Sequence, residues 1–156
     1  MATVRTLDWR AIIARGLIAG LIGAVLIDAF LYVVLLVPNH LAITVIWQTV
    51  AATLVGKPAL SDPSMAWLGL LMHLLISIAW GIAFSYVAHT RSNVPEHPYI
   101  SGIVYGIIVM IIMQIVQMAA DVPLQLTLQA LLIGLCAYAI FFGLPISIYV
   151  SRAMRT

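Results

Sequence analysis

The chain has 156 residues, of which 64% are hydrophobic and only 8% are charged. A soluble globular domain carries about 25% charged residues, so this composition excludes an ordinary soluble protein and indicates a chain whose solvent is lipid. The net charge of +2 is too small to suggest binding to nucleic acid. The single cysteine, Cys136, excludes an intramolecular disulfide and any CxxC redox or zinc site.

Four apolar segments are long enough to cross a hydrocarbon core of about 30 Å at about 1.5 Å per residue. The sequence therefore predicts an all-α bundle of four transmembrane helices, with residues 1–156 as a single membrane domain in the lipid bilayer. The first segment is expected to be a retained helix, because its apolar run exceeds the roughly 7–15 residues of a signal peptide. The predicted spans cover about residues 11–37, 63–88, 99–120 and 124–150.

Basic residues indicate how these spans are oriented. Four crossings place all Lys and Arg residues on one side of the membrane except Lys57. The positive-inside rule then puts both termini in the cytoplasm, and the expected location is a bacterial inner membrane. A fifth crossing by residues 40–55 is disfavoured, since this segment would span only about 24 Å as a helix. We therefore expect residues 40–55 to form an outer-side helix that is interfacial or re-entrant.

Local signals mark the ends of the spans. Asp62 is suited to cap the second span with Pro63 at its first position, where the missing N–H of proline does no harm. Pro145 is expected to distort the last turns of the fourth span, because it cannot donate to the carbonyl four residues back. Trp9 and Trp47, with other aromatic residues, are assigned to belts at the membrane interfaces.

A weak internal repeat relates the two halves of the chain. An offset of 86 residues places Gly16 on Gly102 and Asp28 on Gln114. The sequences SYVAHTR and IYVSRAMR end the second and fourth spans at an offset of 63 residues. These matches favour two duplicated helical hairpins of the same topology, with the outer segment as an insertion in the first half.

Small residues recur at every fourth position in three of the spans, which puts them on narrow ridges of the helices. Such ridges let backbones approach closely where no hydrophobic effect drives association, so packing within the bundle is the simplest interpretation. The same faces could instead bind a second copy or a partner subunit. The predicted helix-packing residues are Gly16, Gly20, Ala24, Gly69, Ser77, Gly81, Gly102 and Gly106.

Asp28 is the only carboxylate deep within a predicted span, about 20 Å from Arg15 along the helix axis. His73 and Gln114 reach a similar depth on the next two spans, with Gln117 one turn further out. Ionisable groups inside a span are costly and normally face the protein interior. We therefore predict that these four residues form a buried polar cluster. It is either a hydrogen-bonded lock between helices or a site for a proton, a polar solute or a ligand.

A cofactor at His73 is a further alternative. Gly69 lies one turn before His73 and would leave room for a flat macrocycle, such as a haem or a pigment, with His73 as axial ligand. No second histidine lies at this depth, so a bis-histidine haem would need another chain. A metal would find only His73, Asp28, Cys136 and methionine sulfurs, which is a sparse set of ligands.

The patterns RGLIAGLIGAVLID, HLLISIAWGIAFSYV and SGIVYGIIVMII resemble those of uncharacterised small bacterial inner-membrane proteins with four helices and glycine-spaced hairpins. The resemblance covers most of the chain and implies a topology without a chemistry, and the segment 40–55 departs from it. Small multidrug transporters also have four helices and a carboxylate in the first. Their compact loops and sequence pattern are absent here, so their mechanism is not carried over.

The chain contains no phosphate-binding loop, nucleophile elbow, HExxH motif or paired carboxylates, and we do not expect an enzyme. The first expectation is an integral structural or accessory subunit that acts through helix–helix association, either as an oligomer or with other membrane subunits. The first alternative is a small transporter or channel that uses Asp28 and His73. The second alternative is a cofactor-bearing subunit with His73 as ligand.

Overall fold

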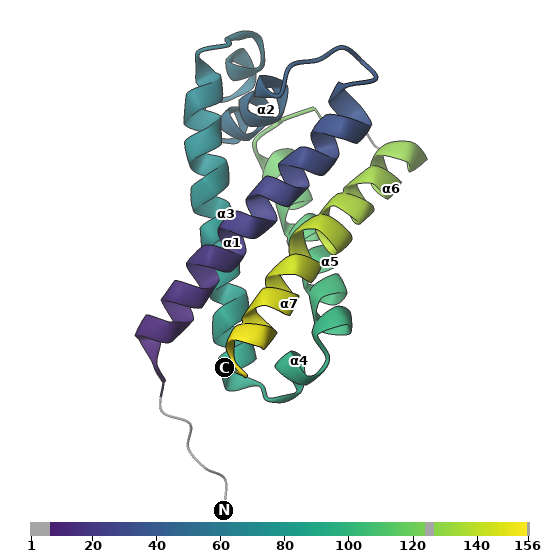
Figure 1. Ribbon diagram of the computed structural model, residues 1–156. Helices are drawn as coiled ribbons and strands as arrows, with labels where there is room; N and C mark the ends of the chain where they lie inside the picture. Colours follow the sequence, from purple (N-terminus) through teal and green to yellow (C-terminus); the bar gives the residue numbers. More distant parts are fainter. Residues whose placement is uncertain (1–6, 124–126, 156) are drawn as a thin grey trace, which may run out of the picture.

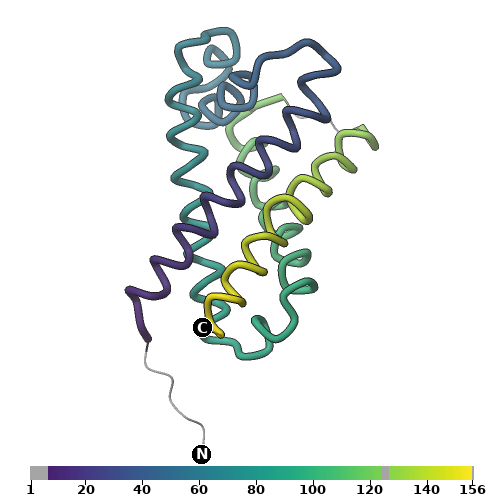
Figure 2. Tube along the Cα trace, viewed as in Figure 1, coloured from purple at the N-terminus to yellow at the C-terminus, as the bar shows by residue number. Residues whose placement is uncertain are grey.

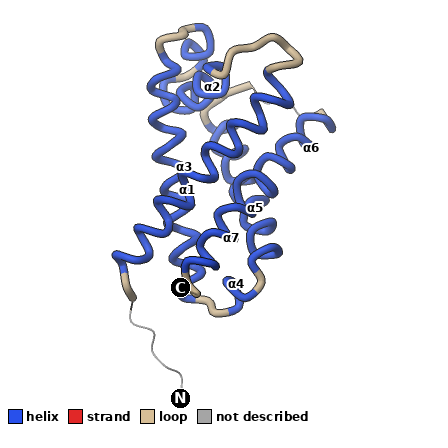
Figure 3. The backbone as a smooth tube through the Cα atoms, in the orientation of Figure 1, coloured by secondary structure: helices blue, strands red, loops and turns tan. Residues whose placement is uncertain are grey.

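The computed structural model describes residues 7–123 and 127–155, and within these ranges it contains helices and no strands (Figure 3). Four helical rods are long and apolar enough to cross a membrane: Trp9–Leu36, Met65–Thr90, Pro98–Ala119 and Leu128–Ala153. The predicted all-α bundle of four such helices is therefore confirmed. The predicted beginning of the fourth span, at residue 124, lies outside the described residues.

Two helical hairpins make up the bundle, and a short cap lies at each end (Figures 1 and 2). Each hairpin contains one rod with a π-helical piece, in which the hydrogen bonds skip one residue more than in an α-helix. The piece ends the rod in the first hairpin and interrupts it in the second. The elements are α1 (Trp9–Leu31), the π-helical η1 (Tyr32–Leu36) and α3 (Met65–Thr90) in the first hairpin, and α5 (Pro98–Ala119), α6 (Leu128–Cys136), the π-helical η3 (Ala137–Gly143) and α7 (Leu144–Ala153) in the second.

Glycines bring α1 and α3 into backbone contact where they cross. A Cβ on Gly81 would collide with backbone atoms of Gly16 and Gly20, and Cβ atoms on those two residues would collide with the backbone of α3. No flexible side chain could yield at these points, because the colliding atoms belong to the helix backbones. The four-residue ridges of the sequence are thus buried between the helices of one hairpin.

The second hairpin repeats this contact atom for atom. A Cβ on Gly143 would collide with the carbonyl oxygen of Gly102 and with the backbone nitrogen and Cα of Gly106. These atoms correspond to the ones that Gly81 meets in the first hairpin. The structure therefore pairs residue 81 with residue 143, an offset of 62. This is one residue less than the offset of 63 that the sequences of the helix endings give.

The π-helical segment η3 accounts for the changing offset. The carbonyl oxygen of Ser77 lies against Gly20 in the first hairpin. The carbonyl oxygen of Tyr138 lies in the same way against Gly106, an offset of 61. One residue is therefore added within η3, between this contact and the glycine crossing. The distortion expected near Pro145 is present, and it lies in the turns directly before this proline, where a carbonyl loses its ordinary donor.

The cap at one end is α2 (Thr44–Val55), followed by the 3-10 turn η2 (Lys57–Ser61) (Figure 1). A helix is expected in residues 40–55, and α2 packs against the first turns of α3. The side-chain amide of Gln48 is buried and donates to the carbonyls of Ala59 and Leu60, each at 3.4 Å. These bonds tie α2 to η2, so the cap folds as one unit on the bundle.

The predicted start of the second span, with Asp62 as its cap and Pro63 as its first residue, is wrong. The helix α3 begins at Met65, two residues later than predicted. The carboxylate of Asp62 instead accepts from the hydroxyl of Ser64 at 2.7 Å and from its amide at 2.9 Å. These two hydrogen bonds stabilise the ionised form and lower the pKa of Asp62 from its usual value.

Aromatic side chains join the two hairpins in the half of the bundle near α4 (Asn93–Glu96). The ring of Tyr105, on α5, packs edge-on against Phe84 and Trp80 of α3, with centroids 4.8 and 6.1 Å apart. Its hydroxyl donates to the backbone carbonyl of Trp80 at 2.5 Å. This aromatic contact closes the bundle at the α4 end, while α2 fills the space between the hairpins at the other end.

Candidate functional site

The structure brings Asp28 of α1 and His73 of α3 together inside the bundle. Atom Nε2 of His73 lies 3.2 Å from Oδ1 of Asp28, and their side chains are 15% and 13% exposed. The contact lacks hydrogen-bond geometry, so both atoms are buried without a hydrogen-bond partner in the described part of the chain. Such atoms are rare in folded proteins, because each forfeits its bonds to water. The pair is therefore a close contact between two ionisable groups that leaves bonding capacity unused.

Trp47 is a third member of this site, although its sequence context predicts a place in an interfacial belt. Its indole Nε1 donates to Oδ2 of Asp28 at 3.0 Å. The position of Trp47 depends on Gly69, because the backbone carbonyl of Trp47 occupies the space that a Cβ of residue 69 would fill. A glycine one turn into a span is a signal of close backbone approach, and it could have indicated that the outer segment packs there.

A small cavity that is lined in part by polar residues adjoins His73. It has a volume of about 60 Å³, which exceeds the roughly 10–15 Å³ that one water molecule needs. Its walls come from α2, α3, α5 and η3, and the polar residues that line it are Thr49, Thr53, His73, Gln117 and Tyr138. Polar groups on several sides can hold water in such a space. The imidazole of His73 is therefore the point at which the buried pair meets a cavity fit for water.

The helix α2 presents polar residues on two faces. The pattern of polar residues in its sequence therefore does not reveal which face is buried. Gln48 points toward η2, whereas Thr49 and Thr53 line the cavity. Their hydroxyls donate to the carbonyls of Val45 and Val50 within the helix, so their lone pairs stay available to the cavity. The buried side of this helix therefore combines alanines with the polar residues Gln48, Thr49 and Thr53.

Gln114 and Gln117 have different placements in the structure. Gln117 lines the cavity with His73, but Gln114 does not. The Oε1 atom of Gln114 is instead buried without a hydrogen-bond partner among the described residues. Depth along the helix axis is similar for both residues, and only the rotation of α5 separates them. Of the four predicted cluster residues, Asp28 and His73 touch, and Gln117 joins them through the cavity.

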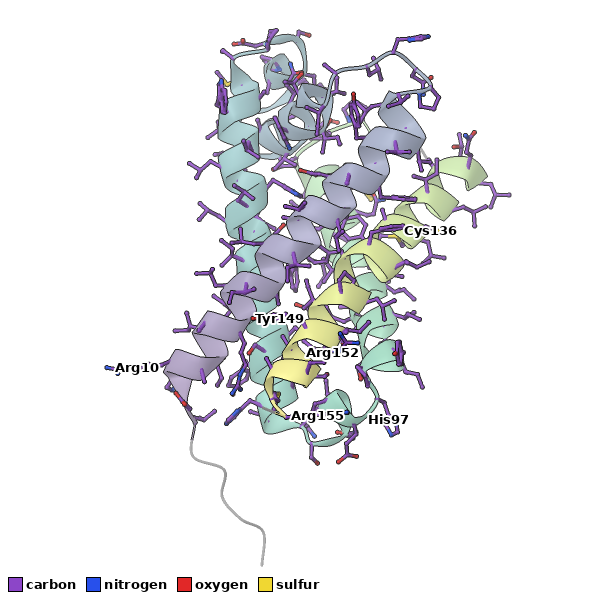
Figure 4. The ribbon with its side chains drawn as sticks, in the orientation of Figure 1. Arg10, His97, Cys136, Tyr149, Arg152 and Arg155 are labelled. Atoms are coloured by element: carbon purple, nitrogen blue, oxygen red, sulfur yellow. The ribbon has the colours of Figure 1, made fainter. Side chains whose placement is uncertain are left out.

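The geometry leaves little space for a cofactor at His73. The space above Gly69 that would admit a flat macrocycle is filled by the backbone of Trp47. Pockets that hold organic ligands measure about 300–1,000 Å³, far more than the cavity beside His73. Cys136 is not among the residues that line this cavity; it lies at the end of α6 (Figure 4). Across residues 7–123 and 127–155, no three His, Cys, Asp or Glu side chains gather as metal ligands.

The small residues of the predicted ridges are used inside the chain. Most of them are buried between the helices of their own hairpin, and the remaining one, Gly69, is covered by α2. Residues of these ridges that are buried within the hairpins are Gly16, Gly20, Ala24, Ser77, Gly81, Gly102 and Gly106. These faces are therefore not open to a second copy or a partner subunit.

The Asp28–His73 pair can hold a proton without net charge. With one proton shared, the pair is either an ion pair or two neutral groups, and neither form places a net charge in a low-dielectric interior. Removal of that proton leaves a buried carboxylate held by Trp47 alone, and addition of a second leaves a buried cation.

Comparisons of the chain with protein-family models, curated proteins and solved structures gave no match.

Proposed function

We propose that the protein is a small integral membrane channel or transporter that passes protons, alone or with a small polar solute, through the Asp28–His73 site. One observation carries this proposal: the facing atoms of the pair are buried without hydrogen bonds, and His73 borders a cavity that is lined in part by polar residues. A purely structural lock gains its stability by satisfying its own polar groups. Unused donors and acceptors beside a cavity of this kind suit the exchange of a proton with water.

The orientation of the site in the membrane is part of the proposal. The start of α1 and the end of α7 lie at the same end of the bundle as α4 (Figure 1). Arg10, Arg91, Arg152 and Arg155 belong to this end, and Lys57 to the end capped by α2. Under the positive-inside rule both termini are cytoplasmic, in a bacterial inner membrane, and α2 closes the pathway on the outer side.

The test is proton flux into liposomes that contain the purified protein and a trapped pH-sensitive dye. Under a proton gradient, Asp28→Asn is expected to lower the flux by about 100-fold, because the amide keeps the shape but cannot carry the proton. Asp121→Asn is the matched control, since this carboxylate is 87% exposed and pairs with Lys57 on the surface. The control is expected to retain the flux of the wild type.

Two results would contradict the proposal. One is a flux in Asp28→Asn equal to that of Asp121→Asn, which would show that protons do not pass through the pair. The other is a wild-type flux no greater than that of empty liposomes, under gradients of protons and across a panel of small polar solutes. Unfolding curves of the variants in detergent separate a lost pathway from a lost fold.

A structural or accessory subunit is the second candidate, and α6 favours it. None of the residues Leu128–Cys136 is buried, although this helix is apolar. Leu128, Leu131, Leu132 and Leu135 are exposed along it, so a second membrane helix could pack there. This candidate predicts an oligomer or a complex with other membrane chains that survives mild detergent. A monomer that conducts protons at wild-type rate would contradict it.

A further inference from the structure

A second pocket lies at the opposite end of α5 from the Asp28–His73 site. It has a volume of about 450 Å³ and is bounded by the first turn of α5 and the last turns of α7. Figure 4 shows that His97, Arg152 and Arg155 gather in this part of the bundle. The residues that line it are Glu96, His97, Pro98, Tyr99, Ile100, Ile148, Ser151, Arg152 and Arg155.

The charge of the lining favours an anion. Arg152 and Arg155 contribute two guanidinium groups, which remain protonated at any physiological pH. Glu96 is the one carboxylate on the lining, and it is exposed. His97 adds donor capacity beside it. The two arginines therefore outweigh the single acidic group, and their planar guanidinium groups match the oxygen atoms of a phosphate.

The beginning of α5 adds donors that the helix itself does not use. The first amides of a helix have no partner within it, and here no side chain at the N-cap, His97, accepts from them. Pro98 has no N–H, so the free donors of the first turn are those of Tyr99 and Ile100, which both line the pocket. The helix dipole also places partial positive charge at this end.

Ser151 is the observation that points to a bound ligand independently of the helix end. Its side chain lines the pocket and is 2% exposed, and its Oγ is buried without a hydrogen-bond partner in the described residues. A hydroxyl in this position costs stability unless something accepts its proton or donates to it. An oxyanion in the pocket would satisfy it.

Hydrogen bonds hold the walls of the pocket in place. Ser147, which is fully buried on α7, donates to the backbone carbonyl of Pro98 at 2.8 Å. The guanidinium of Arg155 donates to the carbonyl of Pro95 at 3.1 Å and keeps further N–H groups for a ligand. The first bond joins α7 to the start of α5, and the second joins the residue two positions after α7 to α4. These bonds fix the walls of the pocket against each other.

We propose that this pocket binds a phosphate group at the cytoplasmic end of the bundle, held by Arg152, Arg155, Ser151 and the first amides of α5. Ile100 and Ile148 make part of the wall apolar, so the phosphate can belong to the headgroup of an anionic lipid whose chains run along the helices. A free phosphate ester or inorganic phosphate presents the same oxygen atoms. The proposal is independent of the proton pathway at the other end of the molecule.

The first experiment compares binding by the wild type and by the double variant Arg152→Gln/Arg155→Gln. Native mass spectrometry counts retained phosphatidic acid against phosphatidylcholine, and calorimetry in phosphatidylcholine nanodiscs measures inorganic phosphate. The double variant is expected to bind about 30-fold more weakly, because it loses two charge-assisted contacts. Arg10→Gln removes one positive charge from α1, where the side chain points away from the pocket (Figure 4), and is expected to bind as the wild type does.

The two arms distinguish the sources of the phosphate. Retention of phosphatidic acid without binding of inorganic phosphate identifies a lipid site, and binding of both identifies a site for the phosphate group itself. Binding of neither, or equal losses in Arg10→Gln and the double variant, would overturn the proposal, because a general attraction to basic residues would then suffice.

A second measurement uses the wild type alone, so it does not depend on the folding of a variant. Phenylglyoxal modifies exposed arginines, and peptide mapping reports the rate at each one. Phosphatidic acid or phosphate is expected to slow modification of Arg152 and Arg155 and to leave Arg10 unchanged. Equal protection of all three residues by either probe, or no protection of any, would contradict a specific phosphate site in this pocket.

Discussion

Gly81→Ala is expected to separate α1 from α3 and to lower the free energy of unfolding by about 3 kcal/mol, at the upper end of overpacking effects. The added methyl group would occupy the positions of backbone atoms of Gly16 and Gly20. Rotamer changes cannot relieve this collision, so the two helices must move apart along the whole crossing. Gly143→Ala is expected to have a similar effect, because its Cβ would meet the same atoms in the second hairpin. Reversible unfolding in mixed micelles measures both.

Gly134→Ala is the matched control. A Cβ at this position would meet only the Sδ atom of Met110, at 3.7 Å, which is an ordinary contact. Because alanine favours a helix over glycine by up to about 1 kcal/mol, this variant is expected to be as stable as the wild type or slightly more so. Equal losses in Gly81→Ala and Gly134→Ala would mean that the crossing is not the source of the effect.

The second large effect is expected from a double-mutant cycle at the Asp28–His73 pair. His73→Leu leaves the buried carboxylate with only Trp47 as partner and is expected to cost about 3 kcal/mol of stability. The double variant Asp28→Leu/His73→Leu replaces both polar groups with apolar ones and leaves only the indole N–H of Trp47 without its acceptor. It is therefore expected to lose about 1 kcal/mol, less than His73→Leu. The same micelle unfolding assay measures all four members of the cycle.

This cycle separates a structural lock from a functional site. If the pair exists to hold α1 against α3, the double variant loses about as much stability as His73→Leu. If the pair exists to carry a proton, the double variant keeps most of the stability and loses the proton flux. A double variant as unstable as His73→Leu would therefore contradict the proposed function, even where the flux of the single variants falls as expected.

The depth of the polar residues could be predicted because a helix advances by a constant rise for each residue. Counting from Arg15 and Pro63 brings Asp28 and His73 to one level, and in the structure their side chains are 3.2 Å apart. The same count puts Gln114 close to that level, yet Gln117 is the residue that reaches the cavity. A count along the axis contains no information on how α5 is rotated, and rotation is set by packing.

Composition and local pattern alone determined that this chain is an all-α membrane protein with four spans and glycine-dependent hairpins. Apolar length and residue spacing are local properties, and lipid leaves a helix few alternatives. Only the tertiary structure decided that α2 covers one end of the bundle, with Trp47 on Asp28, and that Arg152, Ser151 and the start of α5 share a pocket. Those contacts join residues far apart in sequence, and they depend on the crossing angles and rotations of whole helices, which no single segment encodes.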